Sequence, residues 1–190
     1  MPAETTTDSP RRRELLESAY HYALQHGLAE MSLRPLAAAI GSSPRVLVFL
    51  FGNKDGLVRA LLERARADEL ALLERIHPTA GLARAVAELW AWLAAEEHRG
   101  LLRLWVEAYA RSLIDPGGVW AGFARATVED WLALLADCQP AERRDTAAAV
   151  AERTRALAIL RGALLDLLAT GDRQRLDAVV AREVELRDAG

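Results

Sequence analysis

The 190-residue chain contains very little cysteine, and this scarcity excludes several kinds of protein. Cys138 is its one cysteine, so the chain can form neither an internal disulfide nor a metal site built on several thiolates. So low a cysteine content is typical of proteins in a reducing compartment. Cys138 has no evident base partner in the sequence, and we interpret it as a bystander thiol.

Long hydrophobic runs are missing as well. The opening residues, MPAETTTDSP, lack the apolar core of a signal peptide. The most apolar stretch elsewhere, ALAILRGALLDLLA, is interrupted by Arg161 and Asp166. We therefore expect a cytoplasmic protein with no membrane partner.

The sequence also lacks the usual signatures of catalytic and metal sites. Its four histidines lie in separate neighbourhoods, at His21, His26, His77 and His98. There is no HExxH pair, and no glycine-rich loop that could cradle a phosphate. We expect neither an enzyme nor a bound metal or cofactor.

Charge is distributed unevenly along the chain. The whole chain carries a net charge of −3, whereas residues 11–66 hold nine basic and five acidic side chains, a balance of +4. Such a basic segment on an acidic body suggests contact with a polyanion, although a merely solvated surface would give the same pattern.

Helical periodicity runs through nearly the whole chain. A first amphipathic helix should end at Gly27, and a second should begin after Ser32 and close at Gly41. Turn-forming residues separate the remaining helices, which we place at 54–76, 79–97, 101–113, 119–136, 141–169 and 172–187. The sequence therefore predicts an all-α fold of about nine helices, preceded by a disordered arm at residues 1–10.

One apolar run, residues 46–51 (VLVFLF), has the composition of a buried strand. No second strand candidate exists to pair with it, and unpaired backbone is costly. Ser43 can cap a helix here, with Pro44 at its first position. We predict a short helix whose inner face carries Leu47, Leu50 and Phe51.

Two short helices joined by a glycine turn make a helix-turn-helix, whose second helix can enter a DNA major groove. Residues 13–61, with HGL, SLRPLAAAIGSSPRVL and FGNKDGL, resemble the DNA-binding region of TetR-type transcriptional regulators. Val48 and Leu50 stand where that family commonly has Tyr and His, so two polar contacts to the DNA backbone are lost. For Val48, Phe49 and Leu50, core packing or a protein contact is the alternative, and we favour packing for Leu50.

The candidate DNA-binding residues lie in and around this predicted reading helix. They are Arg34, Ser42, Ser43, Arg45, Val46, Phe49 and Lys54. We expect Arg45 to reach base edges, and Val46 and Phe49 to touch thymine methyl groups. Arg34 and Lys54, with the arginines at 11–13, are placed to meet phosphates.

The resemblance implies that the body, residues 58–190, binds a small ligand and forms a homodimer. The aromatic candidates for a pocket, which would suit an apolar or aromatic effector, are Trp92, Trp105, Tyr109, Trp120, Phe123 and Trp131. Ordinary core packing is the alternative for each of them. The last two helices supply the expected dimer contacts, Leu157, Leu160, Leu164, Leu168 and Val179, in a four-helix bundle.

The expected protein is thus a homodimeric regulator in which residues 11–57 bind DNA. The resemblance implies repression from a palindromic operator and release when the ligand binds. The alternative is a helical ligand-binding or protein-interaction protein of the same fold with little DNA affinity.

Overall fold

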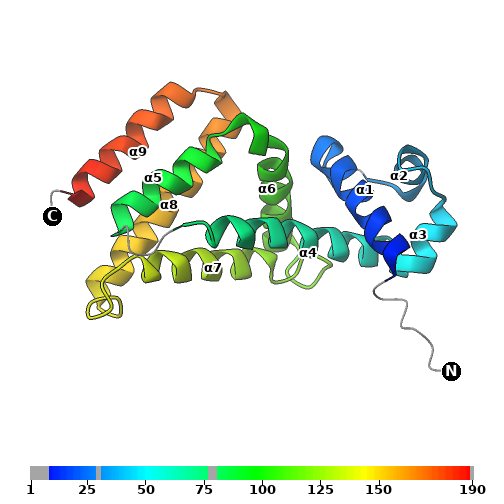
Figure 1. Cartoon of the computed structure of the whole chain (residues 1–190), viewed down its shortest axis with the longest axis horizontal. Helices are drawn as coiled ribbons and strands as arrows, with labels where there is room; N and C mark the ends of the chain where they lie inside the picture. Colours follow the sequence, from blue (N-terminus) through cyan, green and yellow to red (C-terminus); the bar gives the residue numbers. More distant parts are fainter. Residues whose placement is uncertain (1–8, 29–30, 77–80, 189–190) are drawn as a thin grey trace. The chain divides into compact units, whose positions relative to one another are not determined.

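The computed structural model describes residues 9–28, 31–76 and 81–188, and those residues are largely helical (Figure 1). Its helices are α1 (Pro10–His26), α2 (Leu33–Ala39), α3 (Pro44–Phe51), α4 (Lys54–Leu73), α5 (Gly81–Leu93), α6 (Arg99–Ile114), α7 (Phe123–Asp137), α8 (Ala147–Thr170) and α9 (Arg173–Asp188). A short 3-10 turn, η3, covers Glu96–His98. No strand occurs in the described ranges, and the all-α prediction is confirmed.

The helices form two compact units. The first contains the described residues up to Asp68 together with Arg103–Phe123, and the second contains Glu69–Leu102 and the described residues from Ala124 onward. Helices α4 and α6 each contribute residues to both units. The predicted division after residue 57 concerns function and stays a prediction.

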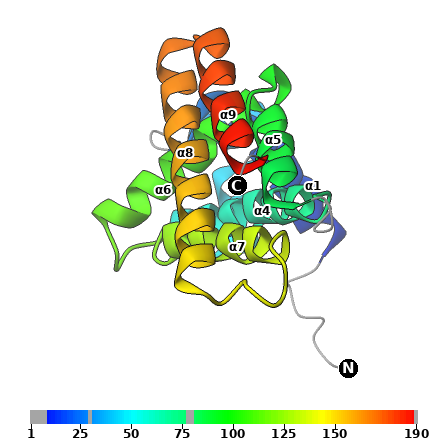
Figure 2. The same ribbon diagram turned by 90° about the vertical axis from the view of Figure 1, so that its left-hand side faces the viewer.

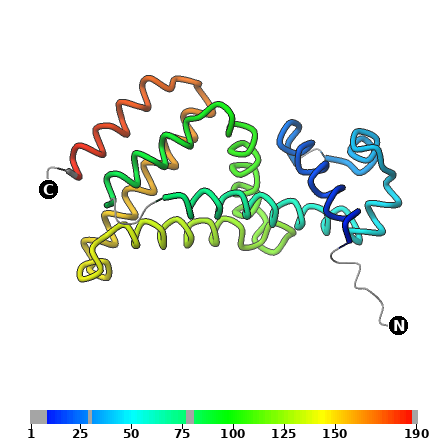
Figure 3. Tube along the Cα trace, in the orientation of Figure 1, coloured from blue at the N-terminus to red at the C-terminus, as the bar shows by residue number. Residues whose placement is uncertain are grey.

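The helix-turn-helix lies in the first unit. Helices α2 and α3 meet at 103°, within the usual range for this motif (Figure 3). The turn between them contains Gly41 at a φ of +63°, a left-handed conformation that glycine adopts without steric cost. The predicted arrangement of two short helices around a glycine turn is confirmed.

The VLVFLF run is the helix α3. The Ser43 hydroxyl caps it by accepting a hydrogen bond from the Val46 N–H at 3.3 Å, and Pro44 occupies the first turn. Leu47 and Phe51 are buried, while Leu50 is half-buried. Tertiary packing of this inner face outweighs the strand propensity of the isolated sequence.

A close contact joins the end of α3 to the start of α4. The Asn53 Oδ1 accepts a hydrogen bond from the Gly56 N–H at 2.8 Å, which caps α4 as predicted. A Cβ atom on Gly56 would overlap the Phe51 carbonyl oxygen, a backbone atom that cannot rotate away. The junction therefore requires glycine at position 56.

In the second unit, α5 packs against α8 and α9 (Figure 2). The indole N–H of Trp90 on α5 donates to Asp177 Oδ1 on α9 at 2.8 Å. Arg173, also on α9, donates to the Ala94 carbonyl oxygen at 3.1 Å. These polar contacts fix α9 against α5 beside a core of buried leucines.

The start of α8 is predicted wrongly, and the start of α7 is displaced by a few residues. Helix α7 begins at Phe123 rather than at residue 119, because residues 115–122 form hydrogen-bonded turns. Helix α8 begins at Ala147 rather than at residue 141, because the Thr146 hydroxyl caps it by accepting from the Ala149 N–H at 3.2 Å. Ser9 and Pro10 belong to the start of α1, and the rest of the predicted arm, residues 1–8, lies outside the described residues, as do residues 79–80.

In the part of the chain that the structure describes, no individual helix has the length and apolar composition of a membrane span. Helices α2 and α3 meet those criteria only when taken together, as the pair bent by 103°.

Candidate DNA-binding surface and ligand-binding body

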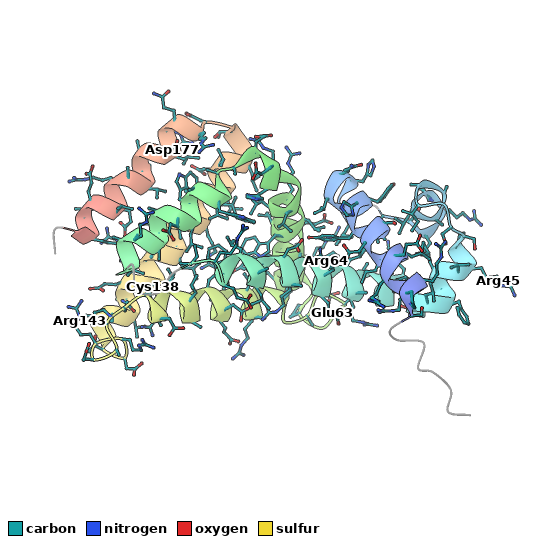
Figure 4. All side chains as sticks on the ribbon, viewed as in Figure 1. Arg45, Glu63, Arg64, Cys138, Arg143 and Asp177 are labelled. Atoms are coloured by element: carbon teal, nitrogen blue, oxygen red, sulfur yellow. The ribbon has the colours of Figure 1, made fainter. Side chains whose placement is uncertain are left out.

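The outer face of α3 carries one arginine among apolar side chains. Arg45 is exposed and points away from its unit (Figure 4). Phe49 is 73% exposed, Val48 42% and Val46 37%. At 3.6 residues per turn, Arg45 and Phe49 share the centre of this face and the two valines flank it. We call these four residues the reading face.

Four exposed cations belong to this helix-turn-helix and the start of α4. They are Arg34, Arg45, Lys54 and Arg59. Within the described residues none of the four takes part in an ion pair. Phosphate groups are the natural partners of such a set of unpaired cations.

Other predicted DNA contacts already have roles inside the protein. Arg11 forms an ion pair with Glu14 at 2.7 Å, and the Arg12 guanidinium lies 4.9 Å from the centre of the Phe51 ring. The Ser43 oxygen caps α3. The Ser42 hydroxyl oxygen is buried and has no hydrogen-bond partner, so the structure does not present it to a bound duplex.

A polar cluster holds α1 to the first part of α4. The Tyr20 hydroxyl donates to Asp68 Oδ2 at 2.8 Å, and Arg64 pairs with both Asp68 and Glu17. The Arg64 guanidinium also lies 4.8 Å from the Tyr20 ring centre. Burial and the hydrogen bond to Asp68 raise the pKa of Tyr20 well above its ordinary value. No local pattern in the sequence indicates this cluster, because its contacts between α1 and α4 join residues 47 or 48 positions apart.

Glu107 on α6 holds the end of α1, also within the first unit. Its Oε2 accepts a hydrogen bond from the Leu28 N–H at 2.9 Å, and its Oε1 is buried without a partner. The contact satisfies a backbone donor just beyond Gly27, where α1 ends. No local pattern in the sequence indicates this contact.

The structure divides the predicted pocket residues between the two units. Trp105, Tyr109, Trp120 and Phe123 belong to the first, where the Trp105 and Tyr109 ring centres are 5.5 Å apart, as the four-residue spacing predicts. Trp92 and Trp131 belong to the second. The prediction that these six residues line one pocket is not tested and stays a prediction.

In the second unit, Trp131 contacts a buried carboxylate that the sequence did not reveal. Its indole N–H donates to Glu69 Oε1 at 2.5 Å, and the Thr127 hydroxyl donates to Glu69 Oε2 at 3.4 Å. Glu69 is 5% exposed. Trp92 stacks on His98, with ring centres 3.9 Å apart. Both tryptophans are thus held in fixed orientations.

The second unit also contains a cavity of about 620 Å³. It is lined by Arg84, Arg143, Arg155 and Arg187 together with Gln139 and Cys138, and by none of the six predicted aromatic residues. Burial raises the pKa of the Cys138 thiol, which agrees with its interpretation as a bystander. The cavity lies within the size range of small-molecule sites.

Three of the predicted dimer contacts are buried in the protomer itself. Leu157, Leu160 and Leu164 are no more than 2% exposed and pack in the core of the second unit, so they are not free to meet a second subunit. Leu168 is half-buried and Val179 is 46% exposed. Other exposed apolar residues are Val150 and Leu165 on α8, at 40% and 51%, and Leu186 on α9, which is 47% exposed and lines the cavity. The dimer contacts are not tested and stay a prediction.

No protein-family model matches the sequence, and no curated protein matches it. Solved structures do match over nearly its whole length. A TetR transcription regulator from Haloarcula marismortui is 20% identical with a TM-score of 0.74, and the match covers 96% of this chain and 98% of that one.

The multidrug binding protein EbrR is similar in two structures. The complex with proflavin is 24% identical with a TM-score of 0.64, covering 91% of this chain and 99% of that chain. The complex with imidazole is 25% identical with a TM-score of 0.68, covering 96% and 93%. Together with the helix-turn-helix described above, these similarities show that the chain has the fold of TetR-type transcriptional regulators.

Proposed function

We propose that the protein is a cytoplasmic DNA-binding transcriptional regulator rather than an enzyme. As a homodimer it would repress transcription from a palindromic operator and leave the DNA when a small, mostly apolar or aromatic ligand binds. The observation that carries this proposal is the reading face on α3 together with the unpaired cations Arg34, Lys54 and Arg59. An exposed helix among unpaired cations suits the major groove and its phosphates.

The outward faces of α8 and α9 support the homodimer. Leu165 and Val179 are exposed there, and Leu168 is half-buried. Two such helices from each protomer could form a four-helix bundle around a two-fold axis. A two-fold dimer presents two copies of α3, which suits half-sites one duplex turn apart, about 34 Å.

Aromatic side chains held in place by polar neighbours support a ligand-binding role. Trp131 is fixed by Glu69, and Trp105 lies beside Tyr109. The multidrug binding protein EbrR, which has a similar fold, is known in a complex with proflavin. A ligand could act on DNA binding through α4, because this single helix contributes Lys54 to one unit and Glu69 to the other.

Selection of duplexes from a random DNA pool tests the proposal directly. The purified protein is mixed with the pool at near-physiological salt, and bound duplexes are sequenced. We expect a palindrome to be enriched, and we expect its affinity to fall steeply with salt, as counterion release requires. Proflavin and aromatic acids can then be screened for release of the selected duplex.

Failure to enrich any sequence with a folded, dimeric protein would contradict the proposal. The alternative of a helical ligand-binding or protein-interaction protein would then stand. A protein partner held by apolar contact to α3 would show little dependence on salt, in contrast to DNA.

A further inference from the structure

The reading face offers DNA very little hydrogen bonding. Arg45 is the one exposed side chain of α3 that carries N–H donors. The Ser43 hydroxyl accepts from the Val46 N–H at the start of the helix and keeps its own O–H, while the Ser42 hydroxyl oxygen is buried. Phe49, which is the most exposed apolar residue of the helix, has no polar atom in its side chain.

Base edges in the major groove differ in one apolar group. Thymine presents a C5-methyl group there, whereas cytosine presents an N4 amino group and guanine two acceptors. An apolar side chain placed against an amino group or an acceptor removes water from it and returns no hydrogen bond. A methyl group placed against the same side chain is removed from water, and this burial of apolar surface favours binding.

We propose that the reading face recognises its operator chiefly through pyrimidine C5-methyl groups, which Phe49 contacts with help from Val46 and Val48. Arg45 supplies the main polar base contact, for which a guanine beside the methyl-bearing pyrimidines is the natural partner. The proposal rests on the proposed DNA-binding function and names the chemical group that the binding selects.

Charge complementarity identifies DNA rather than a protein as the occupant of this apolar face. The unpaired cations Arg34, Lys54 and Arg59 accompany it within the same short stretch of chain. A duplex supplies both partners at once, because its phosphates meet the cations and its thymine methyl groups meet the apolar centre.

Methyl removal in the DNA gives a sharp test. The duplex enriched from the random pool is remade with deoxyuridine in place of each half-site thymine in turn, which deletes the methyl group and keeps the pairing. Binding is measured at constant salt. We expect affinity to fall about 3- to 5-fold for each contacted methyl group, the effect of burying one such group. Replacing a contacted thymine with cytosine should also lower the affinity. 5-Methylcytosine at the same position restores the methyl group and should recover part of that lost affinity.

Protein variants connect the methyl effect to Phe49. The Phe49→Ala variant should bind two duplexes with equal affinity when they differ only by deoxyuridine or thymine at the position that Phe49 contacts. Ile114→Ala is the matched control, because Ile114 is 79% exposed and lies on α6. This control should keep the full difference between the two duplexes.

The outcomes separate the inference from the function on which it rests. A selected palindrome that binds equally well with deoxyuridine throughout would overturn methyl recognition and leave DNA binding intact. A methyl effect that persists in Phe49→Ala at every position would overturn the role of Phe49. If no duplex is enriched, the proposed function and this inference both fail, and a protein partner of the apolar face replaces them.

Discussion

At the scale of single residues, Arg45 and Lys54 carry the same charge but should contribute differently to DNA binding. Arg45 lies at the centre of the reading face, whereas Lys54 is the first residue of α4. We expect Arg45→Ala to weaken the selected duplex by about 1–3 kcal/mol and to relax the preference at one base position. Lys54→Ala should weaken all sequences alike and reduce the salt slope by about one.

Fluorescence anisotropy with the selected and a random duplex over a range of salt distinguishes these effects. Equal losses on both duplexes for Arg45→Ala would refute its part in base recognition. Arg84→Ala is a suitable control, since Arg84 is paired with Glu88 on α5 and lies outside the helix-turn-helix.

Tyr20 should make the free energy of unfolding fall as the pH becomes strongly alkaline. Its pKa is raised in the folded state by burial and by the hydrogen bond to Asp68, so the folded protein holds this proton above pH 10, where the unfolded chain releases it. The contribution is therefore fully present below about pH 10 and is lost as pH rises further, by about 1.4 kcal/mol per pH unit.

Urea unfolding of the protein and of Tyr20→Phe at several pH values isolates this contribution. The variant should lose about 1 kcal/mol at neutral pH, because Asp68 loses a hydrogen bond, and should show a shallower fall above pH 10. Tyr22→Phe provides the comparison, since Tyr22 is only half-buried on the same helix. Parallel curves for Tyr20→Phe and the unaltered protein would contradict the assignment.

At the scale of elements, α3 depends on its cap. Ser43→Ala removes the acceptor of the Val46 N–H and should lower the free energy of unfolding by about 1 kcal/mol. Ser42→Ala deletes a buried hydroxyl that has no partner and should change the free energy of unfolding by less than about 0.5 kcal/mol. Urea unfolding of the two variants compares adjacent serines of the same chain, and equal losses would show that the cap is not what stabilises α3.

The elements also show how far the sequence could be interpreted. It predicted α3 as a helix because capping residues and the lack of a pairing strand outweighed composition. It misplaced the starts of α7 and α8, where turns precede the caps and the apolar pattern continues through them. Leucines at 157, 160 and 164 were assigned to a dimer contact because periodicity identifies an apolar face but not which neighbour covers it. Glu69, Glu107 and Arg64 act through residues distant in sequence, which no local pattern reveals.

At the scale of the whole molecule, the proposed dimer predicts a clear effect of charge on α8. Leu165 is 51% exposed on the outward face, so Leu165→Arg should place a charge in the interface. We expect the dissociation constant of the dimer, measured by analytical ultracentrifugation, to rise at least about tenfold, which corresponds to about 1.4 kcal/mol.

Ile114→Arg adds the same charge on α6, where Ile114 is 79% exposed, and should leave the association unchanged. Circular dichroism spectra of both variants should match that of the unaltered protein, which serves as the check that they are folded. An unaltered dissociation constant for Leu165→Arg would mean that the two subunits, if they associate, do so elsewhere.

Gly56 restricts how the sequence around α3 can evolve. Any other residue there would push a side-chain carbon against the Phe51 carbonyl oxygen and move the end of α3. Phe49, in contrast, has open space around a largely exposed ring. If α3 reads DNA as proposed, lineages can therefore reach new operator preferences by single substitutions on the exterior of α3, while the glycine that seats this helix on α4 has to be inherited unchanged.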